Sequence, residues 1–161
     1  MDAIVTEGIV NEVITMALPM LRQICANQRY TWGPRGVVIM VGGNGLASPL
    51  TRVMWEELGP KATWAERYEG CDFEKIASEK LQESLRTGLP SSVIVQQMPY
   101  RLRSGDSFYG GAVAKDTDLA VSVSGLYEDM DETCGWIIWD AITGLCKRAV
   151  KDLQRQNVDH L

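Results

Sequence analysis

The sequence predicts one α+β domain whose antiparallel sheet is flanked by helices, and three observations support this fold class. Apolar residues recur every three or four positions in segments near both ends and in the middle of the chain, which is helical spacing. Short β-branched segments come in two pairs, each separated by a turn, so strands pair locally rather than through βαβ crossovers. The length of 161 residues suits one core, and no repeat or linker divides it, so we expect a single domain over residues 1–161.

The first elements are a helix and a hairpin. Residues 7–28 follow the period of an amphipathic helix, and Pro19 inside them predicts either a kink or two shorter helices. The β-branched segment at residues 36–41 is typical of a buried strand, and residues 42–45 (GGNG) tolerate the positive φ of a tight turn. Residues 50–58 are expected to return as the second strand of an antiparallel hairpin.

Two helices are predicted next. Asp72 can cap a helix that carries one apolar stripe and ends at Gly88. Pro90 suits the first turn of a second, shorter helix, which Pro99 ends.

A second hairpin and a long helix complete the chain. Residues 107–115 and 118–125 are separated by a two-residue turn and predict two paired strands. Asp129 and Glu132 form a D-x-x-E helix start. The apolar positions that we expect on the inner face of this helix are Cys134, Ile137, Ile138, Ala141, Ile142, Leu145, Val150 and Leu153.

Composition and charge exclude several classes of partner. Apolar residues make up 45% and charged residues 23%, which is typical of a globular protein. The net charge is −5 and the basic residues are scattered, so we expect neither nucleic acid nor a membrane as a partner. The first residues carry acids where a secretory signal carries lysine or arginine, which favours a cytoplasmic protein.

Four cysteines lie far apart, at positions 25, 71, 134 and 146, without a C-x-x-C pair. Metal-ligand spacing is therefore absent, and no metal site is expected. Buried free thiols in a reducing compartment are the simpler interpretation, with disulfides as the alternative.

Several short patterns occur in a fixed order in the second half of the chain. The helix IASEKLQESLRTGLPSS ends in a small-residue turn, and a glycine pair, Gly110 and Gly111, leads into a strand. A strand end at residues 123–125 (VSG) precedes a helix start with Asp131 and Glu132. This order resembles the GlcG/HbpS family, which includes the carboxy-terminal domain of PduO-type proteins. The first half agrees more loosely, through its long helix, its glycine turn and Arg52 in the strand after it.

The resemblance implies a profilin-like fold, with a five-stranded antiparallel sheet in a three-layer α/β/α arrangement. It also implies frequent self-association into homo-oligomers and, in some members, binding or degradation of haem. One departure is that the only histidine is His160, beside the carboxy terminus, where an axial ligand of haem iron is not expected.

Few conventional catalytic groups are present. A Ser-His-Asp or Cys-His pair would have to use His160, and a multi-histidine metal site is impossible. We therefore interpret the chain as a small-molecule-binding protein of the GlcG/HbpS type, with haem or another tetrapyrrole as the candidate ligand and no other cofactor indicated. An enzyme that uses Asp131 or Glu132 as acid or base on a small anionic substrate, and a non-catalytic interaction module, are the alternatives.

The ligand would lie near the glycine pair and the following strand end. The candidate binding residues are Arg52, Tyr109, Gly110, Gly111, Ser124, Gly125 and Asp131. Each also has a purely structural interpretation: a β-bulge for the glycine pair, helix capping for Asp131 and Glu132, and solvation for Arg52. Trp136 and Trp139 are expected either in a subunit interface or in the core.

Overall fold

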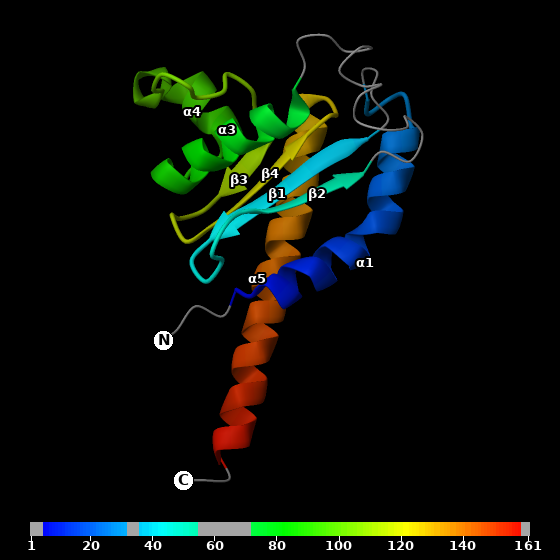
Figure 1. Cartoon of the computed structure of the whole chain (residues 1–161), viewed down its shortest axis with the longest axis vertical. Helices are drawn as coiled ribbons and strands as arrows, with labels where there is room; N and C mark the ends of the chain where they lie inside the picture. Colours follow the sequence, from blue (N-terminus) through cyan, green and yellow to red (C-terminus); the bar gives the residue numbers. More distant parts are fainter. Residues whose placement is uncertain (1–4, 32–35, 55–71, 159–161) are drawn as a thin grey trace.

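The computed structural model describes residues 5–31, 36–54 and 72–158. These residues form four α-helices, one short 3-10 helix and four strands (Figure 1). In chain order they are α1 (Glu7–Ala26), β1 (Val37–Gly43), β2 (Leu50–Met54), α3 (Phe73–Thr87), α4 (Ser91–Gln97), η1 (Pro99–Arg101), β3 (Ala112–Ala114), β4 (Leu119–Ser124) and α5 (Glu128–Val158).

The four strands make one antiparallel sheet in the order β2-β1-β4-β3. The α+β class and the antiparallel pairing are therefore confirmed. The expected five-stranded sheet is wrong for the described residues, which contain four strands. The residue patterns themselves indicate only four strand segments, and the fifth came from the family resemblance.

The sheet separates two cores, because successive side chains of a strand point to opposite faces. Ile39 of β1 and Val121 of β4 face α1 and α5 in the larger cluster. Met40 and Ala120, each one residue away, face α3 in the smaller cluster. Figure 1 shows α3 and α4 on one side of the sheet and α5 passing behind it.

Helix α1 is one helix that continues through Pro19 and changes direction along its course (Figure 1). A proline inside a helix removes one hydrogen bond and crowds the preceding turn, so of the two expectations the bend is confirmed. This helix is long and apolar enough to cross a membrane by composition. One face of the helix, including Val10 and Leu21, packs into the larger core.

The helix predicted between Asp72 and Gly88 is α3, and both of its ends are confirmed. The Asp72 side chain accepts a hydrogen bond from the Lys75 amide at 3.1 Å, and Gly88 ends the helix in the left-handed conformation. The short helix α4 after Pro90 is also confirmed.

Both hairpins are confirmed, but their bounds differ from those expected. Strand β1 runs on through Gly42 and Gly43, which were expected in the turn. Strand β2 is described from Leu50 to Met54, and residues 55–58 lie outside the described residues. Strand β3 covers only Ala112–Ala114, because Gly111 has a φ of +119° that turns the backbone out of extended geometry.

Helix α5 is long, as expected, with 31 residues. Cys134, Ile138 and Ile142 lie in the core, but Ile137 is 40% and Leu153 53% exposed, so the expected inner face is wrong at these two positions. Trp139 packs in the core, where its Nε1–H donates to the Leu119 carbonyl at 3.2 Å. The core interpretation of Trp139 is thus confirmed, and Trp136 packs half-buried against it with ring centroids 5.8 Å apart.

Candidate functional site

A buried lysine lies at the centre of the candidate site. Lys80 is on the face of α3 that packs on the sheet, seven residues after Phe73 and three after Ala77, and it is 1% exposed. The sheet under it is lined by small side chains such as those of Ala112 and Ser122, which lets a long side chain extend between the layers.

The Lys80 ammonium has three acceptors for its three N–H groups. It donates to the carbonyl oxygens of Gly110 at 2.9 Å and Val123 at 2.6 Å, and it forms an ion pair with Asp131 Oδ2 at 3.6 Å. The side chain thereby joins α3 to the residues just before β3, to the end of β4 and to the first turn of α5.

The glycine pair is shaped around this lysine. A Cβ atom on Gly111 would lie 2.6 Å from Lys80 Nζ and 2.8 Å from Asp131 Cβ, both shorter than real contacts. The Gly111 carbonyl accepts from the Val123 amide at 3.1 Å, which continues the pairing with β4 beyond the end of β3. The group that approaches the backbone of the glycine pair is therefore the Lys80 side chain of the chain itself.

Asp131 is buried rather than exposed at a helix end. Its Oδ1 accepts from the Leu126 amide at 2.9 Å, and its side chain is 4% exposed. Burial raises the pKa of Asp131 to about 7, against the opposing effects of Lys80 and of the Leu126 and Gly125 backbone. Burial likewise lowers the pKa of Lys80, against the charge of Asp131. Helix capping alone does not explain the role of Asp131, because this carboxylate also pairs with the charge of the buried Lys80.

A second buried carboxylate, Glu83, lies one turn further along α3. It is fully buried, and neither of its carboxylate oxygens has a hydrogen-bond partner among the described residues. Burial, and then the charge of Asp106, raises the pKa of Glu83 to about 7, while Arg86 and Lys80 oppose this effect. Arg86 is itself held by Asp106 through two hydrogen bonds of 2.9 and 2.6 Å, which fasten the loop after η1 to α3.

Glu83 makes the stability depend on pH. The unfolded chain releases this proton near pH 4.5, whereas the folded chain holds it to about pH 7. The contribution of Glu83 to stability therefore falls as the pH rises through this window, by about 3 kcal/mol in all. We expect Glu83→Gln to become more stable relative to the unmodified chain between pH 5 and pH 8, as measured by urea denaturation. Parallel pH profiles for the two proteins would contradict this prediction.

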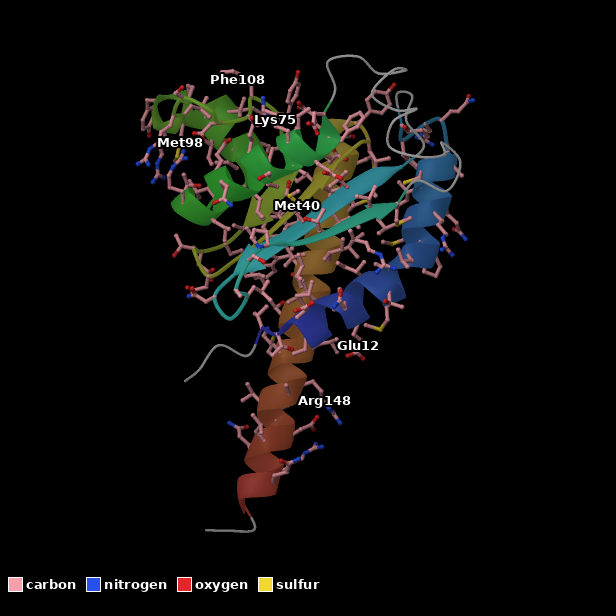
Figure 2. The ribbon with its side chains drawn as sticks, viewed as in Figure 1. Glu12, Met40, Lys75, Met98, Phe108 and Arg148 are labelled. Carbon is pink, nitrogen blue, oxygen red and sulfur yellow. The ribbon has the colours of Figure 1, made fainter. Side chains whose placement is uncertain are left out.

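Three aromatic residues in the chain segments that precede Gly110 and Asp131 are exposed. Phe108 is 72%, Tyr109 53% and Tyr127 47% exposed, and we call these three residues the aromatic surface. The segment of Phe108 and Tyr109 lies beside the segment of Tyr127, because a Cβ on the following residue Gly110 would lie 3.7 Å from the Cβ of Glu128. Figure 2 shows Phe108 at the outer edge of the layer formed by α3 and α4.

The structure brings together most of the residues predicted to bind a ligand. Gly110, Gly111 and Asp131 meet at Lys80, and the Gly125 backbone hydrogen-bonds to Asp131. Tyr109 is exposed beside this group.

The structure places the other predicted residues elsewhere on the sheet and on α5. Ser124 is buried on the α3 face of the sheet, opposite Val38, and Glu132 is half-buried on α5. Arg52 is exposed on the edge strand β2, opposite Ile39, which is in turn opposite Val123. Two strand spacings, about 10 Å, therefore separate Arg52 from the cluster.

Sequence reasoning missed Lys80 and Glu83. The available signal was the position of Lys80 within the apolar stripe of α3, where a lysine on a surface helix is not expected. Glu83 has no such signal, because the nearby groups Asp106 and Ser107 lie in a loop more than twenty residues further along the chain.

The three described cysteines lie in or against the larger core, whereas Lys80 lies on the α3 side of the sheet. Cys25, Cys134 and Cys146 are free thiols, as expected, and burial raises the pKa of Cys25 to about 11 and of Cys134 to about 12. Cys71 and His160 lie outside the described residues.

Comparisons with known proteins found no match to the chain among protein-family models, curated proteins or solved structures.

Proposed function

We propose that the protein binds a small molecule, in the manner of the GlcG/HbpS-type proteins that it resembles, and that the ligand is a planar tetrapyrrole such as haem. The observation that supports this is the aromatic surface, which lies in the chain segments that precede Gly110 and Asp131. Aromatic side chains pack well against a planar ring, and clustered exposed aromatics mark binding sites more often than scattered ones. We further propose a cytoplasmic location.

The residues of this surface fit haem in their donor chemistry. Haem iron is held by His, Cys, Met or Tyr, and Tyr109 and Tyr127 present exposed phenol groups, whereas Cys25 and Cys134 are buried. When bound, the iron would supply redox chemistry. The role of the chain is to stack the ring on the aromatic side chains and to offer a phenol oxygen. Lys80 keeps Gly110 in place behind them.

A titration of the full chain with haemin tests this function. We expect a saturable shift of the haemin absorbance with one ligand per chain, and a binding constant weakened roughly tenfold by Tyr109→Ala. Tyr100→Ala is the matched control, because Tyr100 is 80% exposed in η1 and is not part of the aromatic surface. The affinity of this variant for haemin should equal that of the unmodified chain. Absence of a saturable shift, or equal loss in both variants, would contradict the proposal.

A second candidate function is an enzyme that uses Asp131 as acid or base. The observation that favours it is the Asp131 pKa of about 7, which suits proton transfer near neutral pH. Backbone amides at a helix amino terminus lower the pKa of a carboxyl group, but burial has the larger effect on the pKa of Asp131. Against this candidate, Asp131 is 3% exposed and paired to Lys80, so a substrate would first have to displace the lysine. If the Asp131→Asn variant binds haemin as tightly as the unmodified chain does, Asp131 has a structural role and does not take part in ligand binding.

A further inference from the structure

Two tryptophan rings of α5 form a corner that holds the cation of a lysine from the same chain. The planes of Trp136 and Trp139 lie at 75° to each other, and their centroids are 5.8 Å apart. The Lys115 ammonium lies 4.6 Å from the centroid of Trp139 and 5.5 Å from that of Trp136. Both distances are within the range over which the face of an aromatic ring attracts a cation. Asp140 Oδ1 lies 4.0 Å from the same ammonium nitrogen. We call Trp136, Trp139 and Asp140 the tryptophan corner.

The fold holds this corner in place before any ligand binds. A Cβ on Gly135 would lie 3.2 Å from a methyl group of Val113, so a glycine here lets α5 approach β3 closely. Lys115 follows β3 directly, and its side chain therefore reaches the rings on α5. The Trp139 ring is buried, and its hydrogen bond to the Leu119 carbonyl fixes its orientation. A site whose rings are already ordered loses little conformational entropy on binding.

Lys115 itself is held weakly in the tryptophan corner. Its side chain is 59% exposed and that of Asp140 is 68% exposed. An ion pair between exposed groups contributes little, and a lysine side chain gains rotamer freedom when it returns to solvent. A lysine ammonium is also strongly hydrated, so water competes with the rings for it. Another cation can therefore take its place.

The chemistry of the tryptophan corner favours a methylated ammonium group. Aromatic walls are the means by which proteins recognise quaternary ammonium ligands, because the methyl groups pack on the ring faces that attract the positive charge. We propose that the tryptophan corner binds a trimethylammonium group, and that Lys115 is a tethered competitor that leaves when the ligand binds. Trp139 packs in the core on the α5 side of the sheet, whereas Lys80 belongs to α3 on the other side. The inference is therefore independent of the proposed tetrapyrrole site.

An NMR titration of the full chain with choline tests this site through the indole N–H signals of Trp136 and Trp139. We expect both signals to shift saturably with a millimolar dissociation constant, because each contact of a cation with a ring is weak. The neutral analogue of choline, in which carbon replaces the nitrogen, has the same shape and should shift neither signal. A peptide with trimethyllysine carries the same cation. The tighter binder of the two identifies the source of the group, a free small molecule or a modified protein.

Surface variants test the role of each charge. Lys115→Ser removes the competitor, so choline should bind at least about threefold more tightly. Asp140→Asn removes the opposite charge and Trp136→Leu removes one ring, and each should weaken binding about threefold or more. Lys75→Ser is the matched control, because Lys75 is 71% exposed on α3, across the sheet from α5 (Figure 2), and its affinity should not change.

Three results would overturn the proposal. The first is that choline shifts neither indole signal in the unmodified chain or in Lys115→Ser. The second is an equal shift with the neutral analogue, because the positive charge would then have no part in binding. The third is weaker binding in Lys115→Ser, because Lys115 would then belong to the site instead of competing for it.

Discussion

Replacing Lys80 with methionine is expected to lower the free energy of unfolding by about 3–5 kcal/mol at pH 8, because it leaves the Asp131 carboxylate buried without its partner. The carbonyl oxygens of Gly110 and Val123 lose their donor in the same variant. At pH 5 the loss should be smaller, because the pKa of Asp131 is about 7 even beside Lys80, so that the carboxyl can be buried neutral.

Urea denaturation at the two pH values measures this effect. Lys75→Met is the matched control on the same helix: Lys75 is 71% exposed and 4.0 Å from Glu79, so its loss should change stability by less than about 0.5 kcal/mol. A double variant, Lys80→Met with Asp131→Asn, should lose less than the sum of the two single variants. A loss at Lys80 no larger than that at Lys75 would show that the pair does not hold the site together.

Replacing Gly111 with alanine is expected to destabilise the chain by about 3–5 kcal/mol, for two separate reasons. Its φ of +119° is strained for any residue with a Cβ atom. The added Cβ would also lie 2.6 Å from Lys80 Nζ and 2.7 Å from the Val123 carbonyl oxygen, so that it must displace the lysine from its acceptors.

Alanine substitutions at two other glycines distinguish the effect of backbone strain from the effect of the clash with Lys80. Gly105 has a φ of +90° with nothing within 4 Å of an added Cβ, so Gly105→Ala measures the backbone strain alone. Gly144 lies in α5 with open space around it, so Gly144→Ala should raise stability by up to about 1 kcal/mol. If Gly111→Ala costs no more than Gly105→Ala, the close packing around Lys80 does not contribute.

The sequence allowed the local elements to be predicted where local chemistry decides them. Asp72 and Gly88 mark the ends of α3 because a side-chain cap and a left-handed residue are short-range requirements. The hairpin of β1 and β2 followed from two β-branched segments around a glycine turn. The four-stranded sheet could have been predicted from the same segments, and adding a fifth strand by resemblance was the error.

The candidate site could be predicted only in part. Gly110, Gly111 and Asp131 were expected together, but as the lining of a pocket, whereas the space between them is filled by Lys80. A lysine inside an apolar stripe cannot be assigned a partner until the layers of the fold are known, because its acceptors lie 30 to 51 residues away in the chain. The position of Arg52, two strands away from this cluster, could not be predicted for the same reason, since strand order decides that distance.

The most direct test of the proposed ligand site is an amide NMR titration of the full chain with zinc protoporphyrin, a diamagnetic tetrapyrrole. We expect saturable shifts of the amide signals of Tyr109, Gly110 and Glu128, around the aromatic surface, and no shift of the signals of Gly105 and Gly144. Saturable shifts confined to another part of the chain, or none at all, would contradict the claim that this surface binds a tetrapyrrole.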